Sequence, residues 1–380
     1  DDPRGDAAGG ERIRLEMRVL HCIPTMGGGG AERQLAYLAG AWTGKGLDVH
    51  VALFDGGPNL ERLRSSNAAI HRLSCWSNYD PGIALRLVRL IRAVKPDIVQ
   101  TWIPQMDVLG GVAALWDGVP FVVSERSSSA AYPGSWKDRL RCGLGRKAAR
   151  IVANSEVGRA YWISLGKEAG SIAVIRNGIP FEEIDRCPAE VPGTLQVLPE
   201  EELIVYAGRL SQEKNLWNLM EATRLVLGAR PRARMIFFGE GPQKDRLSAA
   251  AKGGPFGDRV RIHGYTDGIW GILKRANVFA SVSTFEGNPN TVLEAAACRC
   301  PLLLSDIPAH RELLDGESAF FVPPSSVREI AEGVAGVLEH AEEARRRAEK
   351  AYSRVSRYSI DSAAEEYLSV YRAIRRSNGP

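Results

Sequence analysis

Two glutamates eight positions apart, Glu286 and Glu294, stand on either side of a turn that contains glycine and proline. A strand-like apolar run at 278–282 precedes the turn, and an alanine-rich, helix-like run follows it. The pattern predicts strand, turn and helix, with Pro289 in the first helical turn. We expect Glu286 at the mouth of the turn, facing the reactive end of a ligand, and Glu294 on the helix, holding a more distant part. The free N–H groups at the start of such a helix favour a phosphate.

Two cations, Arg209 and Lys214, flank a second predicted turn, after a strand-like run at 203–207. Together they can neutralise a diphosphate without a metal ion, because arginine offers a fork of donors and lysine a point charge. Asp-x-Asp, the commonest short carboxylate arrangement for a metal-bound nucleotide, does not occur in the sequence. We therefore expect no metal site and no cofactor. Taken alone, this turn would be read as a solvated basic loop.

Four consecutive glycines occupy 27–30, between a strand-like run at 18–23 and a helical stripe that begins near Ala31. A tight turn explains one or two glycines but not four, whereas glycine also lets the backbone approach a ligand closely. The sequence is neither GxGxxG nor a Walker A motif, so a nicotinamide dinucleotide is not indicated. The glycines expected at the ligand are Gly28, Gly29 and Gly30.

Strand-like and helix-like runs alternate along the chain, pause in a proline- and acid-rich segment after 182, and then resume. This alternation predicts an α/β protein with parallel sheets covered on both faces. The length of 380 residues favours two domains. We predict two Rossmann-like, doubly wound domains that face a cleft at the carboxyl ends of both sheets. The predicted boundaries are a disordered lead-in at 1–16, an N-terminal domain at 17–185, a linker at 186–201, a C-terminal domain at 202–355, and a helix at 356–380 that returns to the N-terminal domain.

The amino-acid composition indicates a globular protein and argues against membrane-spanning, zinc-binding and nucleic-acid-binding classes. Hydrophobic residues make up 44% and charged residues 25%, as in soluble globular proteins. The sequence has no apolar run long enough for a transmembrane helix and no signal-peptide core, so we expect a cytoplasmic protein. Its six cysteines lack zinc-type spacing and are expected to be free thiols. A net charge of +4 is too small to indicate nucleic-acid binding.

In their order along the chain, these motifs resemble the family 4 retaining glycosyltransferases of GT-B fold. The resemblance covers about residues 17–371, and any single motif is weaker than the ordered set. The motifs that carry it are Gly27–Gly30 with Ala31-Glu32-Arg33, Val174–Ile179, Gly208-Arg209 with Lys214-Asn215, Phe238-Gly239-Glu240-Gly241-Pro242, and Glu286 with Glu294.

The resemblance implies a transferase that keeps the anomeric configuration of a nucleotide-sugar donor and needs no metal. Glu294 would hold the ribose hydroxyls, and Glu286 would lie beside the donor sugar. Arg209 and Lys214 would stabilise the charge that develops on the leaving diphosphate. The other residues that it assigns to donor binding are Gly208, His263, Tyr265, Asn288, Asn290 and Thr291.

The sequence departs from the family pattern after the strand-like run at 121–124. Many members carry a histidine there, near the acceptor and the donor sugar, and Arg126 aligns with it. The charge of Arg126 can meet a phosphate, or an anionic sugar or acceptor. We therefore include Arg126 among the expected catalytic residues, and it hints at a subgroup that handles amino or acidic sugars.

The stretch 132–150 combines basic residues and aromatic residues with one acid, Asp138. This composition fits contact with the anionic inner face of a membrane, or a lipid-diphosphate acceptor. A solvated helix face explains it equally well.

The function predicted from the sequence is transfer of a hexose or N-acetylhexosamine from a UDP-sugar to a saccharide or lipid-linked acceptor. Cell-surface polysaccharide or glycoconjugate synthesis is the expected context. A nucleotide-sugar epimerase of similar architecture and a non-catalytic glycan-binding subunit are the alternatives.

Overall fold

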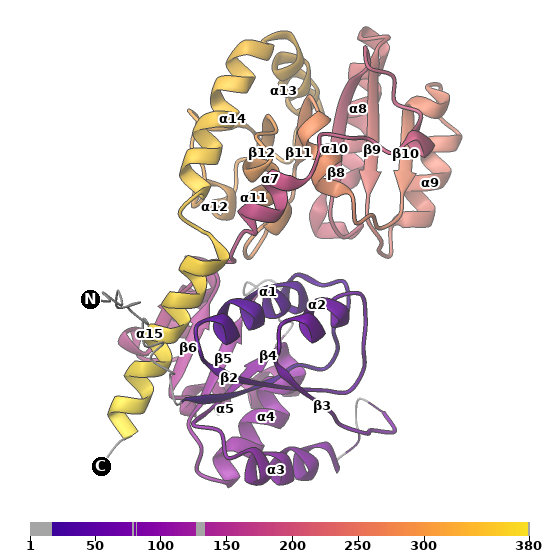
Figure 1. The fold of residues 1–380 in the computed structure, drawn as a ribbon. Coiled ribbons are helices and arrows are strands. Elements are labelled where there is room, and N and C mark those ends of the chain that lie inside the picture. The colour runs from indigo at the N-terminus through magenta and orange to yellow at the C-terminus, as the bar shows by residue number, and fades with distance from the viewer. Residues whose placement is uncertain (1–16, 78–79, 81, 127–133, 379–380) are drawn as a thin grey trace, which may run out of the picture.

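Two parallel sheets, each flanked by helices, form the protein (Figure 1). The computed structural model describes residues 17–77, 80, 82–126 and 134–378. The lead-in expected at 1–16 lies outside these residues. The predicted fold of two Rossmann-like domains is confirmed.

The first sheet has the strand order β3-β2-β1-β4-β5-β6-β7, and the second has the order β10-β9-β8-β11-β12-β13. Every pairing is parallel, which explains why most strands are near-continuous apolar runs buried on both faces. The strands are β1 Arg18–Cys22, β2 Asp48–Leu53, β3 Ala69–Arg72, β4 Ile98–Trp102, β5 Phe121–Glu125, β6 Arg150–Ala153, β7 Ile172–Val174, β8 Glu202–Ala207, β9 Ala233–Phe238, β10 Val260–His263, β11 Val278–Ser281, β12 Leu302–Ser305 and β13 Phe320–Val322.

Helices cover both faces of each sheet. In the first domain α1 and α15 pack on one face, and α3, α4 and α6 pack on the other; in the second, α10, α11 and α14 lie opposite α8, α9 and α13. The helices are α1 Gly30–Gly44, α2 Leu60–Ser65, α3 Gly82–Val94, α4 Pro104–Trp116, α5 Trp136–Lys147, α6 Glu156–Ser164, α7 Phe181–Arg186, α8 Leu216–Ala229, α9 Lys244–Lys252, α10 Ile269–Arg275, α11 Asn290–Ala297, α12 Pro308–Arg311, α13 Val327–Glu339, α14 Ala341–Val355 and α15 Ile360–Asn378. None of the described helices has both the length and the apolar character needed to cross a bilayer.

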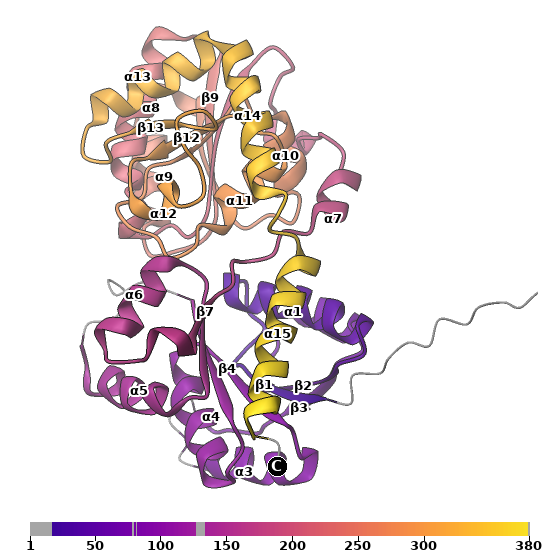
Figure 2. The ribbon, with the colours of Figure 1, turned by 90° about the vertical axis from the view of Figure 1, so that its left-hand side faces the viewer.

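The last helix crosses back from the second domain to the first, as predicted. Figure 2 shows α15 running along the first domain after α14 has packed on the second. Trp42 of α1 donates a hydrogen bond from Nε1 to the Ala364 carbonyl of α15, at 3.3 Å. Tyr367 and Tyr371 of α15 pack their rings against the ring of Trp42. This buried aromatic contact joins the end of the chain to the first domain.

Several elements were not predicted from the sequence, among them β3, β13 and α7. The edge strands β3 and β13 have four and three residues, which are too few for a strand period to be recognised. The helix α7 begins at Phe181 and ends at Arg186, within the proline- and acid-rich segment that showed no period.

Candidate active site

A pocket of about 780 Å³ lies where the carboxyl ends of the two sheets face each other. The first domain contributes the glycine loop after β1 and the first turn of α1. The second contributes the loops that follow β8, β9 and β11, together with the start of α11. Both domains therefore build the pocket, as the predicted cleft requires.

The pocket brings together all but two of the site residues expected from the sequence. The two exceptions are Arg126 and His263. The expected residues that line the pocket are Gly28, Gly29, Gly30, Gly208, Arg209, Lys214, Tyr265, Glu286, Asn288, Asn290, Thr291 and Glu294.

One end of the pocket carries two cations and a carboxylate. Lys214 Nζ lies 2.5 Å from Glu286 Oε1, and Ser283 Oγ donates to the same oxygen at 2.8 Å. The loop that carries Arg209 is held by the Tyr206 hydroxyl, which donates to the Arg209 carbonyl at 3.0 Å. Because an ammonium group has three donors, Lys214 can hold Glu286 and still donate to a phosphate oxygen.

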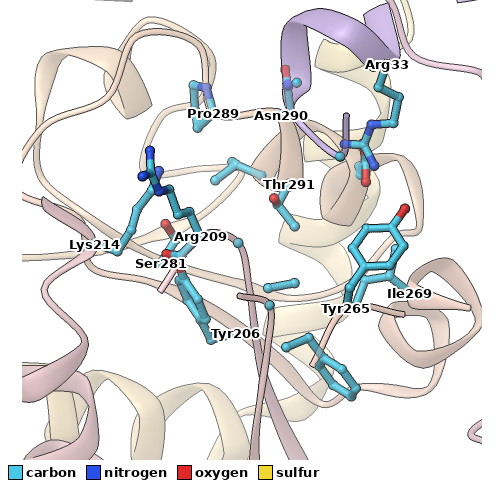
Figure 3. Close-up of a pocket in the computed structure, with 18 of the residues that line it drawn as sticks. Arg33, Tyr206, Arg209, Lys214, Tyr265, Ile269, Ser281, Pro289, Asn290 and Thr291 are labelled. Atoms are coloured by element: carbon cyan, nitrogen blue, oxygen red, sulfur yellow. Dashed lines mark hydrogen bonds and ion pairs between the residues drawn. The ribbon is translucent and has the colours of Figure 1, made fainter. Parts of the chain in front are cut away.

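The other end of the pocket carries Glu294, whose side chain is 9% exposed. Its Oε1 accepts a hydrogen bond from Arg33 of α1, and its Oε2 accepts one from Trp270 Nε1 at 3.4 Å. The Glu294 carboxylate raises the pKa of Arg33, so the ion pair is maintained at neutral pH. Figure 3 shows Arg33 and Tyr265 on one side of Thr291, and Arg209 and Lys214 on the other. The pocket therefore has two separate charged ends.

Two helix N-termini meet between these ends. Helix α1 begins at Gly30 and α11 begins at Asn290, and a Cβ atom on Gly30 would collide with the Asn290 amide nitrogen. A side chain on Gly29 would collide with the Glu32 carboxylate, which folds back beside the glycine loop. Burial raises the pKa of Glu32. Since helix N-termini attract anions, this meeting point suits an anionic oxygen.

His263 is not at the pocket surface. It ends β10, its ring lies 5.3 Å from the ring of Phe238, and Phe238 lines the pocket. The neighbouring Tyr265 does line it. His263 thus lies behind the lining, and its expected part in donor binding stays a prediction.

Arg126 also lies away from the pocket lining, although it was expected among the catalytic residues. Its guanidinium donates to Asn177 Oδ1 at 2.6 Å and to the Tyr367 hydroxyl at 2.9 Å, and it lies 4.3 Å above the ring of Trp102. The side chain is half-buried, and this burial lowers the pKa of Arg126. It turns toward α15 because that helix supplies Tyr367, which is far away in the sequence.

The basic stretch at 132–150 divides into two parts. Tyr132 lies outside the described residues. Arg141 is buried, with Nε 2.6 Å from Asp107 and NH2 2.7 Å from Glu125, so it joins α5 to α4 and β5 instead of facing a membrane. The exposed residues of α5 are Trp136, Lys137, Arg139, Leu140, Arg146 and Lys147.

Two functional contacts were missed in the sequence. Arg33 was quoted within a motif but given no role, although it lies one turn after the glycine loop and so shares that face of α1. Asn177 belongs to the motif at 174–179, and it donates to Asn290 of the second domain. No local signal indicates either partner, since both pairs are formed between the two domains.

Comparison with known proteins assigns the family. Residues 28–183 match the family described as Glycosyltransferase Family 4, and residues 194–354 match Glycosyl transferases group 1. The putative teichuronic acid biosynthesis glycosyltransferase TuaC of Bacillus subtilis is 28% identical over 273 residues, which are 68% of this chain and 66% of that protein. An exopolysaccharide phosphotransferase of Streptomyces coelicolor is 25% identical over 299 residues, 78% of this chain but only 30% of that protein.

Solved structures agree in fold. HepE from Anabaena, in complex with UDP and glucose, matches with a TM-score of 0.82 and 19% identity, over 94% of this chain and all of that one. A glycosyltransferase from Rickettsia africae matches with a TM-score of 0.79 and 18% identity, over 96% of this chain and 100% of that one. With the two family matches in order and the pocket at their junction, the chain belongs to the family 4 glycosyltransferases and has the GT-B fold.

Proposed function

We propose that this chain is a retaining, metal-independent glycosyltransferase that moves a hexose or N-acetylhexosamine from a UDP-sugar to a saccharide or lipid-linked acceptor. Synthesis of cell-surface polysaccharide or glycoconjugate is the proposed context, in line with the name of the TuaC relative. The UDP bound in HepE supports uracil as the base. One observation carries the proposal: Arg209 and Lys214 line the same pocket as Glu286 and Glu294.

The charges at the two ends of the pocket give each group a role. As the bond to the donor sugar breaks, negative charge grows on the leaving diphosphate. Arg209 and Lys214 would stabilise that charge. Glu294 would accept hydrogen bonds from the ribose hydroxyls, and Glu286 would lie beside the sugar. Replacing either cation by alanine should lower turnover by ~10²-fold or more.

A binding and transfer experiment tests the proposal. Thermal unfolding is followed with UDP-, GDP-, ADP- and TDP-sugars in the absence of metal. A donor at a hundredfold excess over its Kd should stabilise the fold by ~2.7 kcal/mol. UDP-sugars should give the shift, and Glu286→Gln should keep it while losing transfer. Binding without transfer to any acceptor would favour the glycan-binding alternative, and conversion of the bound sugar to its epimer would favour the epimerase.

Metal independence has its own measurement. Because two side-chain cations face the leaving group, activity should persist after treatment with EDTA. Loss of activity that Mg²⁺ or Mn²⁺ restores would contradict the two-cation mechanism.

We also propose that α5 contacts an anionic membrane surface. Trp136 is 70% exposed and Leu140 is 43% exposed, with Lys137 and Arg139 beside them in the sequence. Exposed aromatic residues among cations suit a bilayer interface. Sedimentation with anionic vesicles should carry the protein down, whereas Lys137→Glu with Arg139→Glu should leave it in solution.

A further inference from the structure

Arg126 of the first domain is half-buried, and its Nε atom is enclosed without a hydrogen-bond partner among the described residues. Its two terminal nitrogens donate to Asn177 Oδ1 and to the Tyr367 hydroxyl, and neither acceptor is a carboxylate. An enclosed cationic group without a counter-ion is costly to the fold. One of its two hydrogen bonds leads to the pocket.

The donor and acceptor roles of these groups form a chain of hydrogen bonds from Arg126 to the pocket. A guanidinium group can only donate, so Asn177 must turn its amide oxygen toward Arg126. Its amide nitrogen then faces the other way, and it donates to Asn290 Oδ1. Asn288 Nδ2 donates to the same oxygen, at 3.3 Å. With Oδ1 used twice, Asn290 presents its amide nitrogen on the remaining side.

The amide nitrogen of Asn290 lies at the meeting point of the two helix N-termini, beside Gly30. Both helix ends favour negative charge there, and the pocket's Arg209 and Lys214 add to it. A donor held at this point suits an oxygen of a diphosphate. If the amide were reversed, it would present a carbonyl oxygen to that anion, and the two oxygens would repel each other.

We propose that Arg126 is a positioning residue that acts through Asn177 to hold the Asn290 amide nitrogen toward an oxygen of the donor's diphosphate. The inference rests on the proposed UDP-sugar donor. It replaces the expected direct role of Arg126 with an indirect one. We call the chain of hydrogen bonds from Arg126 through Asn177 to Asn290 the relay: the guanidinium fixes the orientation of the Asn177 amide, and Asn177 fixes that of Asn290. Outside the pocket, Arg126 is held by the hydrogen bond that it donates to the Tyr367 hydroxyl of α15.

The affinities of the 380-residue chain for UDP and for uridine distinguish this positioning role from a structural one. Asn177→Asp keeps a partner for Arg126 but cannot donate to Asn290, so the Asn290 amide should reverse. Arg126→Met removes the source of the polarity, and Arg126→Lys retains a donor. The matched control is Arg176→Met, which removes an ion pair with Glu312 that lies outside the pocket lining.

UDP affinity should fall about 10-fold or more in Asn177→Asp and Arg126→Met, because a hydrogen bond to a charged group is lost. Uridine lacks the diphosphate, so its affinity should change less than about twofold. Arg126→Lys and Arg176→Met should resemble the wild type. If Arg126→Met does not fold, Asn177→Asp alone decides.

An unchanged ratio of UDP to uridine affinity in Asn177→Asp would overturn the relay. If both affinities fall by the same factor, the role of Asn177 is structural; if neither falls, the Asn290 amide does not depend on Asn177. A wild-type chain that binds no UDP would refute the proposed donor together with the relay. Wild-type binding with unaffected variants would refute the relay alone.

Discussion

The ion pair between Arg33 and Glu294 allows a quantitative test of the nucleoside end of the pocket. Arg33 belongs to the first domain and Glu294 to the second, 261 positions later. The Arg33 side chain is 25% exposed. In Arg33→Ala, the nearly buried Glu294 carboxylate loses its counter-charge. A buried charge without its partner is costly to keep in place.

The expected loss follows from the hydrogen bonds that the carboxylate makes. A hydrogen bond to a charged group is worth about 1.5–3 kcal/mol. A Glu294 side chain that Arg33 no longer holds in place accepts ribose hydroxyls less well, so the Kd should rise roughly 10- to 100-fold. Uridine and UDP should lose the same factor, since both contain the ribose.

The assay is isothermal titration of UDP and uridine, with Arg176→Ala as the matched control. Arg176 forms a similar ion pair with Glu312 between the domains, with side chains 14% and 15% exposed, but it does not line the pocket. Both variants lose one interdomain ion pair, so a fall in melting temperature alone does not distinguish them. Tighter binding of UDP to Arg33→Ala would refute the reasoning, because Arg33 would then be a competitor that the ribose displaces.

Three further predictions concern stability and catalysis. Gly239→Ala should destabilise the fold by about 1–3 kcal/mol or more in urea unfolding. Gly239 has a φ of 138°, and a Cβ atom there would collide with the Gly208 carbonyl oxygen. As a control, Gly336→Ala should be neutral or stabilising, because Gly336 faces open space on α13. Burial lowers the pKa of His21 from 6.5 to about 3. Between these values the unfolded chain binds a proton on His21 that the folded chain does not bind. The free energy of unfolding should therefore fall by about 1.4 kcal/mol per pH unit as the pH falls from 6.5 toward 3. His21→Phe should flatten the dependence of urea midpoints on pH, and an unchanged slope would contradict the assignment. Lys214→Ala should lower kcat far more than UDP affinity, and equal losses in both would mean that Lys214 contributes only to ground-state binding.

Much of the site followed from the sequence because it lies on local features. The carboxyl ends of parallel strands meet at one edge of a sheet, so turns after strand-like runs were expected to gather there. The positions of these turns in the sequence were therefore enough to predict that Arg209, Lys214 and Glu286 lie together. The glycine run was recognisable because no ordinary turn needs four glycines.

The remaining residues could not be predicted, because their roles depend on partners far along the chain. Arg126 directly follows β5, but the direction of its side chain is set by Tyr367, 241 positions later. The resemblance assigned His263 to donor binding, whereas its ring packs against Phe238 and does not line the pocket. No periodicity or motif encodes which way such a side chain turns.

The helix α11 connects these observations. Asn290 and Glu294 are four positions apart, so they lie on the same helical face and point toward the first domain. The first domain holds both of them, Asn290 through Asn177 and Glu294 through Arg33. Each contact exists only while the two sheets face each other as they do here. The proposed diphosphate site and the proposed nucleoside site are therefore both completed by the first domain, and donor affinity should depend on closure of the domains even though the second domain supplies most of the pocket.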